Sequence, residues 1–278
     1  MEVKILGSGS WEGIPVPFCD CVVCHNAKYS IESKNNRTRP EIWVKTDEGS
    51  FLIEISPDIR VQSTRFDLPI ISDFLLTHWH FDHMYGLLEL DAYAEYFVDG
   101  NMKLYASEET KNWINDNFSH IPDTKVIKVD AFESFVLYGV RVTPFPVFHM
   151  KSQDESMDED KLDNTVGYLL EKNDRKIAYL SDCYKLPKKS LQLLQNVDIA
   201  IIDGTFLFED EFPDKIEQNE IKSEPDHLHG QEIIDFANTL NAKKIILHSI
   251  SHLTEKTHDE LQQKLSKNIF ISYDGMEL

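Results

Sequence analysis

The chain has 278 residues, of which 41% are hydrophobic and 27% are charged, a composition typical of globular proteins and not of disordered or fibrous ones. Its formal net charge of −20 repels polyanions and argues against nucleic acid as a partner. Because the sequence has no signal-peptide pattern and no run of about 18 apolar residues, we expect a cytoplasmic protein without a membrane partner, folded as a single domain over residues 1–278.

Short apolar runs rich in Val, Ile and aromatic residues predict strands along the whole chain. They lie at residues 3–6, 42–44, 51–55, 73–77, 135–145, 166–170, 176–180, 197–203, 243–247 and 269–273. Helical spacing of apolar residues is found at 83–97, 187–194 and 231–240. Since the strands form two long series, each followed by helices, we expect two sheets with the helices outside.

Two segments, 151–160 and 208–226, are acidic and poor in apolar residues. They cannot bury much surface and are therefore predicted to be loops. Each is read either as a surface insertion or as a lid, because both flank candidate ligands.

The first motif along the chain is GSGSWEG at residues 7–13. Its glycine spacing does not fit the G-x-G-x-x-G pattern of dinucleotide sites, so it predicts a tight turn. Ser8 and Ser10 within this turn are candidate phosphate contacts.

Cys19, Cys21 and Cys24 follow in a C-x-C-x-x-C pattern. They lie too close together for the disulfide framework of a secreted protein, whereas three thiolates suit a structural zinc ion, with redox thiols or free cysteines as the alternative. A closed zinc site needs a fourth ligand, and the sequence alone permits His25 or Cys183. Cys183 has no base near it in sequence, so we interpret it as a small buried residue and not as a nucleophile.

The segment FLLTHWHFDHMYG at 74–86 places His78, His80, Asp82 and His83 directly after an apolar run. Burying such polar groups is costly unless something pairs them. Because alternate residues of a strand share a face, we expect His78 and His80 to point the same way, with the chain then turning to present Asp82 and His83. Imidazole and carboxylate ligands together predict a site for zinc, manganese or iron.

Three more candidate ligands follow other apolar runs. His149 comes after FPVF, Asp182 after KIAYLS and His248 after KIIL. Side chains at the ends of strands gather along one edge of a sheet, so these residues predict a second set of ligands beside the first.

The order HWHFDH, His149, LSD at 180–182 and ISH at 250–252 resembles the metallo-β-lactamase fold. More narrowly, the chain resembles the phosphoribosyl 1,2-cyclic phosphate phosphodiesterase family of phosphonate breakdown. Further matches are the opening GSGSWEGIPVPFCDCVVC, the stretch ISPDIR at 55–60 and the closing DGMEL, which together cover nearly the whole chain.

This resemblance implies an α+β four-layer αββα sandwich, made of two mixed sheets with outer helices. It also implies two catalytic divalent metals, manganese or zinc, and one structural zinc. The first catalytic metal is expected on His78, His80 and His149, and the second on Asp82, His83 and a late histidine, with Asp182 bridging the two. The structural zinc is expected on Cys19, Cys21 and Cys24 with His252 as the fourth ligand.

The late histidine is where the sequence departs from the family. The family pattern has Thr-His before Ile-Ser-His, whereas this chain reads LHSISH, so that an ungapped alignment puts Ser249 at the ligand position. A shift of one residue turns a strand side chain to the opposite face. His248 is therefore expected to reach the second metal only if the strand end bulges or turns.

By the same resemblance, His227 in PDHLHGQE is the general acid that protonates the leaving alkoxide. Histidine suits this role because its pKa lies near working pH. His229 is read as a residue of the following helix start, with an exchange of roles between His227 and His229 left open. Asp82, as a metal ligand, counts with His227 among the catalytic residues.

The leading hypothesis is a metal-dependent hydrolase that opens a cyclic phosphodiester with hydroxide formed at the metals, acting on a small phosphorylated substrate. A second hypothesis keeps the fold and changes the substrate, as in a nuclease, a thioesterase or a relative of the pyrroloquinoline quinone biosynthesis protein B. A third is a non-catalytic metal- or ligand-binding protein with a degenerate second metal site. A homodimer is compatible with each of them.

Overall fold

The computed structural model describes residues 1–118, 124–149, 165–208 and 226–278. Its strands form two mixed sheets, one of six strands in the order β1-β2-β3-β4-β5-β6 and one of seven in the order β13-β12-β11-β10-β9-β8-β7. The loop predicted at 151–160 lies outside the described residues, as does nearly all of the loop predicted at 208–226.

The first sheet contains β1 (Glu2–Gly7), β2 (Glu41–Thr46), β3 (Gly49–Ile53), β4 (Asp73–Leu75), β5 (Met102–Ala106) and β6 (Thr124–Lys128). The second contains β7 (Phe135–Leu137), β8 (Val140–Val147), β9 (Thr165–Lys172), β10 (Arg175–Tyr179), β11 (Ile199–Asp203), β12 (Lys244–His248) and β13 (Ile269–Ile271). The helical segments are α1 (Val22–Lys28), α2 (Ile59–Arg65), α3 (Phe81–Met84), η1 (Tyr85–Leu88), α4 (Asp91–Phe97), α5 (Glu108–Asn117), α6 (Lys188–Leu193), α8 (Gln231–Thr239), η3 (His252–Thr254) and α9 (His258–Gln263).

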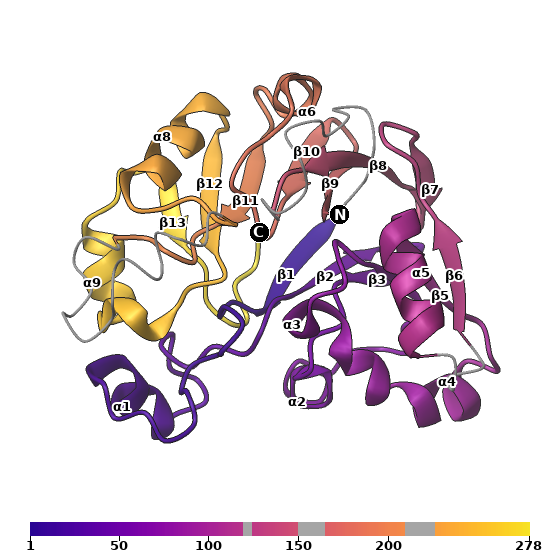
Figure 1. The fold of residues 1–278 in the computed structure, drawn as a ribbon, viewed down its shortest axis with the longest axis horizontal. Coiled ribbons are helices and arrows are strands. Elements are labelled where there is room, and N and C mark those ends of the chain that lie inside the picture. The colour runs from indigo at the N-terminus through magenta and orange to yellow at the C-terminus, as the bar shows by residue number, and fades with distance from the viewer. Residues whose placement is uncertain (119–123, 150–164, 209–225) are drawn as a thin grey trace.

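The two sheets pack face to face, and helices cover their outer faces (Figure 1). Apolar side chains from both sheets, among them Ile53 and Tyr179, fill the space between the sheets. A second core lies between the first sheet and the helices α2 to α5, and a third lies between the second sheet and α6, α8 and α9. These layers confirm the expected αββα sandwich.

Two sequence predictions about the elements need correction. The run 135–145 is a hairpin of two strands, because Tyr138 and Gly139 take φ values of 47° and 71° and turn the chain between β7 and β8. The helix predicted at 83–97 is three short segments, α3, η1 and α4. The first break lies at Met84, whose φ is −142°, and Gly86 within η1 donates its N–H to the carbonyl of Ile55 at 3.0 Å instead of to a helical partner.

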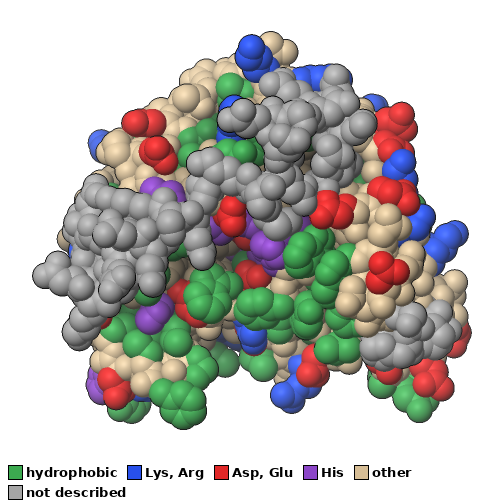
Figure 2. Space-filling model, in the orientation of Figure 1, with side chains coloured by type: hydrophobic (Ala, Val, Ile, Leu, Met, Phe, Trp, Pro, Cys, Tyr) green, Lys and Arg blue, Asp and Glu red, His purple; other side chains and the backbone are tan. Residues whose placement is uncertain are grey.

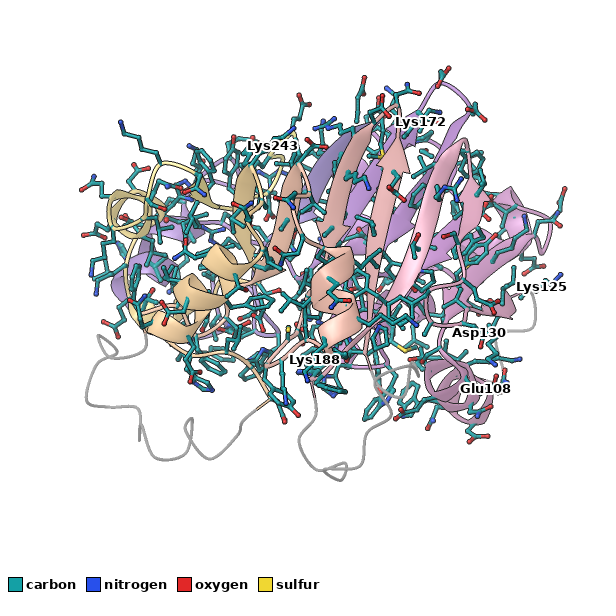
Figure 3. All side chains as sticks on the ribbon, turned by 90° about the horizontal axis from the view of Figure 1, so that it is seen from above. Glu108, Lys125, Asp130, Lys172, Lys188 and Lys243 are labelled. Atoms are coloured by element: carbon teal, nitrogen blue, oxygen red, sulfur yellow. The ribbon has the colours of Figure 1, made fainter. Side chains whose placement is uncertain are left out.

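The carboxyl ends of several strands meet at one edge of the sandwich. In Figure 3, Lys172 and Lys243 lie at one edge of the second sheet and Lys188 lies near the opposite edge. Since β10, β11 and β12 are parallel and β12 starts at Lys244, their carboxyl ends lie at the edge near Lys188. The segments that follow β4, β8 and β10 hold the predicted ligands His78, His80, Asp82, His83, His149 and Asp182, His227 lies after β11, and His248 ends β12. On the face shown in Figure 2, histidine side chains lie near the centre.

Among the described residues, no helix is long and apolar enough to cross a membrane.

Candidate active site

The histidine motif lies in the segment that follows β4. This strand ends at Leu75, so the expectation that His78 and His80 alternate on the strand itself is wrong. Instead, His80 precedes α3 with an extended backbone, and its carbonyl accepts from the N–H groups of His83 and Met84 at 3.1 and 3.2 Å. The short helix explains why the motif divides into two groups of ligands.

The first group consists of His78, His80, His149 and Asp182, whose ligand atoms all lie within 4.8 Å of one another. Asp182 Oδ2 lies 3.6 Å from His78 Nε2 and 3.5 Å from His149 Nε2. His149 Nε2 lies 3.2 Å from His80 Nδ1. Three chain segments far apart in sequence thus converge on one point, as their positions after β4, β8 and β10 predict.

Neighbouring groups fix the orientation of His78, which is fully buried. Thr77 Oγ1 donates its one proton to Glu54 Oε1 at 2.7 Å, so His78 Nδ1, 2.9 Å away, has to donate to Thr77. The lone pair of His78 is therefore on Nε2, which faces Asp182. Hydrogen bonds of this kind commonly hold a metal-binding imidazole in the required tautomer.

The second group consists of Asp82, His83 and Asp182. His83 Nε2 lies 3.1 Å from Asp82 Oδ2 and 3.3 Å from Asp182 Oδ2, and His83 Nδ1 lies 3.1 Å from Glu54 Oε1. Glu54 is a residue that the sequence reasoning missed. The available signal was a glutamate inside the apolar run FLIEI, and the structure buries it completely.

The residues of both groups fit divalent cations. His78 Nε2 is buried without a hydrogen-bond partner, which is costly unless another group takes its lone pair. His83 Nε2 faces the carboxylates of Asp82 and Asp182. His149 Nδ1 lies 2.8 Å from the carbonyl of Asp226 and donates to it, so its Nε2 presents a lone pair toward His80. Asp182 Oδ2 belongs to both groups and lies where a bridging ligand is expected.

The electrostatic surroundings keep the first-group imidazoles neutral. Burial, followed by repulsion from His149, lowers the pKa of His80 to about 4. Burial and the neighbouring His83 likewise hold the pKa of His78 well below its ordinary value. Neutral imidazole is the form that binds a metal, so at neutral pH these two residues are ready to do so.

A histidine–aspartate pair, His227 and Asp203, lies beside the first group of ligands. His227 Nδ1 is 2.6 Å from Asp203 Oδ2, and the rings of His149 and His227 have centroids 4.9 Å apart. Burial alone would lower the pKa of His227, but the charge of Asp203 and its hydrogen bond raise it to about 9. The sequence analysis did not single out Asp203, although this residue lies at the end of the apolar run VDIAIID, as other site residues lie at the ends of apolar runs.

Asp203 is itself held in place by the chain around it. Its Oδ1 accepts from the N–H and the hydroxyl of Thr205 at 2.9 and 2.7 Å, and its Oδ2 accepts from the N–H of Cys183 at 3.1 Å. Cys183 is fully buried in the core against α6 and α8, as its interpretation from sequence predicts.

His248 and Ser249, unlike the other predicted ligands, lie in none of the groups of possible metal ligands among the described residues. His248 ends β12, is fully buried, and both its ring nitrogens lack a hydrogen-bond partner. In the strand, His248 lies on the same side as Ile246, which belongs to the core between the sheets. The ring centroids of His248 and Tyr179 are 5.8 Å apart. Ser249 takes a φ of 56°, so the chain does turn here, and Ser249 lines the cavity described next.

A cavity of about 430 Å³ opens over the two groups. Its polar lining comes from His80, Asp82, His149, Asp182 and His227, with further residues from the segment after β11 and the N-terminal turn. Ser10 lines it, whereas Ser8 is fully buried and donates to Asp274 at 2.7 Å. His229 stacks on Phe206 at 4.8 Å.

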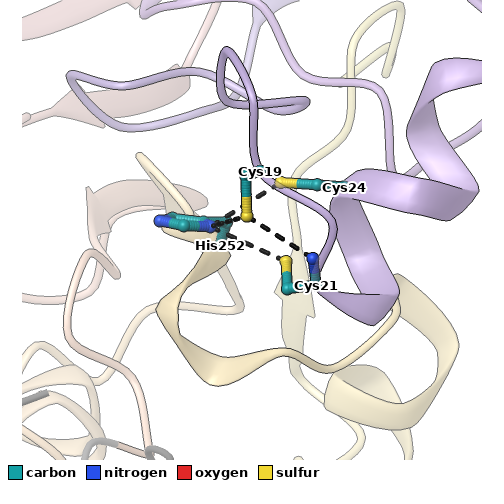
Figure 4. Close-up of side chains that lie close together, drawn as sticks. All are labelled: Cys19, Cys21, Cys24 and His252. Atoms are coloured by element: carbon teal, nitrogen blue, oxygen red, sulfur yellow. Dashed lines mark hydrogen bonds between the residues drawn. The ribbon is translucent and has the colours of Figure 1, made fainter. Parts of the chain in front are cut away.

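The three cysteines gather around His252 (Figure 4). The Sγ atoms of Cys19, Cys21 and Cys24 lie 3.5, 3.7 and 3.6 Å from His252 Nδ1. Tetrahedral zinc, with bonds of about 2.3 Å to sulfur and about 2.0 Å to nitrogen, separates these atoms by about 3.5 Å. The residues therefore fit a closed zinc site, and the side chain that lies beside the three thiols is that of His252 and not that of His25 or Cys183.

The comparisons with known proteins agree on the fold. The family model described as "Beta-lactamase superfamily domain" matches residues 50–250. The octanoyltransferase of Porphyromonas gingivalis is 25% identical over the whole chain, and this chain spans about half, 51%, of that protein. The coenzyme PQQ synthesis protein B of Methylobacterium radiotolerans is 31% identical over 76% of this chain and 75% of the relative.

Solved structures that match the whole chain include two with TM-scores of 0.79 or above. A diphosphatase of the PhnP family superposes with a TM-score of 0.80 at 28% identity, covering 96% of that protein. The Zn²⁺-bound PqqB from Methylobacterium extorquens superposes with a TM-score of 0.79 at 24% identity, covering 99% of that protein. The second likeness bears on the fold alone.

Proposed function

This chain belongs to the β-lactamase superfamily and has the metallo-β-lactamase fold, and we propose that it is a metal-dependent phosphodiesterase that opens a small cyclic phosphodiester. The observation that carries this proposal is the position of Asp182 Oδ2, which both ligand groups share. The His227–Asp203 pair, which lies beside the first group, supplies the proton donor that such a reaction needs.

In this proposal, His78, His80 and His149 would hold one cation, Asp82 and His83 would hold the other, and Asp182 would be a ligand to both. When bound, two such cations polarise phosphoryl oxygens and lower the pKa of water, which supplies a nucleophile near neutral pH. The ligand chemistry suits manganese or zinc. Substitution of His248 and of Ser249, each in turn, decides which of the two residues completes the ligand set of the second cation.

The protein's own residues orient the reacting groups. The substrate enters the cavity with its phosphoryl group over Asp182. His227 is held through Nδ1 by Asp203, so that Nε2 is the nitrogen left to give a proton to the leaving oxygen. Since the pKa of His227 is about 9, this imidazole is protonated at neutral pH, the state that a general acid requires. Asp203 acts through His227 and is a positioning residue.

The structural zinc on Cys19, Cys21, Cys24 and His252 is part of the same proposal. It joins the N-terminal segment to η3, close to the turn at Ser249. Glu12 strengthens this link, since Glu12 Oε1 accepts from Ser251 Oγ at 2.5 Å and from the N–H of His252 at 3.2 Å.

A second candidate function follows from the 31% identity to a coenzyme PQQ synthesis protein B. In that case the same metal site would serve a step in making this cofactor, and cyclic phosphodiesters would not be substrates. The phosphodiesterase is preferred because His227 and Asp203 form a proton-donating pair beside the metal groups.

The test is hydrolysis of ribose cyclic phosphodiesters by protein equilibrated with manganese or zinc. We expect turnover that is abolished in His149→Ala and reduced at least about 100-fold in His227→Asn, with the metal content of the latter unchanged. His229→Asn is the matched control and should stay close to wild type. Loss of turnover in His229→Asn but not in His227→Asn would instead mean that the two histidines exchange roles.

A lack of turnover with any of these substrates, in protein that holds both cations, would refute the phosphodiesterase and favour the second candidate.

A further inference from the structure

Aromatic side chains from three separate segments wall the cavity over the metal groups. Trp11 comes from the N-terminal turn, Trp79, Phe81 and Tyr85 come from the segment after β4, and Phe206 comes from the segment after β11. In Figure 2, hydrophobic side chains lie beside the histidines near the centre of this face.

Core packing does not explain the most exposed of these rings. Trp79 and Tyr85 pack against the core beneath the first sheet, but Trp11, Phe81 and Phe206 belong to none of the core clusters of the described residues. Trp11 is 56% exposed and Phe81 is 41% exposed. Exposed apolar groups are unremarkable when scattered, but several around one cavity indicate a binding surface.

Other groups hold the rings in place. Trp79 stacks on Trp113 with ring centroids 5.5 Å apart and an interplanar angle of 10°. Phe206 stacks on His229 at 4.8 Å with an angle of 3°. A ring that is braced by a second ring loses little freedom when a ligand stacks on it, which favours binding.

Trp11 is exposed, yet the chain on either side of it is anchored. The N–H of Ser10 donates to the carbonyl of Ile250 at 3.3 Å, and Ser10 Oγ donates to the Glu12 carboxylate. Glu12 in turn holds the backbone N–H of His252. The turn therefore presents an indole at the cavity from a fixed backbone.

We propose that the ligand of this cavity carries a flat aromatic ring next to its phosphoryl group, as a nucleoside cyclic phosphate does, and that Trp11 is a specificity-determining residue that stacks on this ring. The proposal rests on the proposed phosphodiesterase function for the position of the phosphoryl group. Stacking of a base on an aromatic side chain strengthens binding by about 5- to 150-fold, is tolerant of base identity, and needs no hydrogen bonds to the base.

The experiment compares two substrates that differ only in the ring. Adenosine 2′,3′-cyclic phosphate and methyl riboside 2,3-cyclic phosphate share the sugar and the phosphodiester, and a methoxy group replaces the base in the second. We expect kcat/KM for the adenosine substrate to be higher by about 10-fold or more. In Trp11→Ala this preference should shrink to within about 3-fold, while Trp11→Phe keeps most of it. Tyr96→Ala, which removes a 72% exposed ring on α4, is the control and should change neither value.

A binding measurement separates this proposal from the proposed function. Titration calorimetry of the metal-loaded protein with adenosine 3′-phosphate and with methyl riboside 3-phosphate requires no turnover. Tighter binding of the adenosine compound, lost in Trp11→Ala, supports the aromatic subsite even if neither cyclic substrate is hydrolysed. Equal affinity for the two compounds, or an equal effect of Trp11→Ala on both, overturns the proposal even if both cyclic substrates are hydrolysed.

Discussion

Substitution of Asp203 by asparagine should change the pH dependence of turnover and not only its size. Asp203→Asn keeps the shape of the side chain but removes the charge that holds the proton on His227, 2.6 Å away. A rise in the pKa of His227 from its ordinary 6.5 to about 9 corresponds to roughly 3 kcal/mol in favour of the imidazolium form. Burial acts in the opposite direction, and Asp203 makes the largest contribution that raises this pKa, followed by Asp182 and Asp226.

The sign and size of the effect follow from this shift. A general acid works while it is protonated, so wild-type activity should be lost as the pH rises through about 9, and activity of the variant as it rises through about 6.5 or below. At about pH 8, roughly 90% of wild-type His227 carries the proton, against about 3% at a pKa of 6.5. We therefore expect a loss in kcat of about 30-fold near pH 8 and a much smaller loss near pH 6.

The assay is kcat across the pH range for wild type, Asp203→Asn and Thr205→Val, each checked for metal content. Thr205→Val removes a hydroxyl that donates to Asp203 at 2.7 Å but leaves the charge in place, so its pH profile should stay close to that of wild type. An Asp203→Asn loss of the same size at every pH would show that Asp203 does not act on the protonation of His227.

Three further predictions concern stability and metal content. Cys24→Ser should remove one tightly held zinc ion per chain and lower the melting temperature, and zinc retained at the wild-type level would contradict the four-ligand site. Gly86→Ala should cost about 1–3 kcal/mol of unfolding free energy, because the added Cβ would lie 2.1 Å from the carbonyl oxygen of Ser56; an unchanged urea midpoint would refute this. Burial and the nearby Arg37 lower the pKa of His258 to about 4, so the unfolded chain binds more protons between about pH 6.5 and 4 and stability should fall as the pH falls through this range. His258→Asn should flatten that part of the curve of urea midpoint against pH, and an unchanged slope would show that His258 does not cause it.

Much of the candidate site could be predicted because its residues lie in short motifs or directly after apolar runs. His78, His80, Asp82 and His83 are neighbours in sequence, so any fold of that segment keeps them close. His149 and Asp182 follow β8 and β10, which run in the same direction because each is antiparallel to β9, so their carboxyl ends meet at one edge. Both inferences require only the local sequence pattern and the direction of the strands in the sheet.

Other features depend on contacts that no local pattern reveals. The strands β5 and β6 were missed because MKLYA and TKVIK interleave lysines with short apolar residues. Glu54 and Asp203 act through partners far away in sequence, Thr77 and His227, and so carried no motif of their own. The turn directly after His248 depends on a left-handed residue at Ser249, which one sequence does not predict for a serine.

The central claim, a dinuclear metal centre beside a separate zinc site, is tested most directly by the metal content per chain. Protein prepared without chelator and equilibrated with manganese should hold about three divalent ions. Brief treatment with a chelator should remove two of them, together with turnover, and leave one zinc. Protein that holds only the zinc after equilibration, with His78 and His83 intact, would contradict the dinuclear centre and the hydrolase built on it.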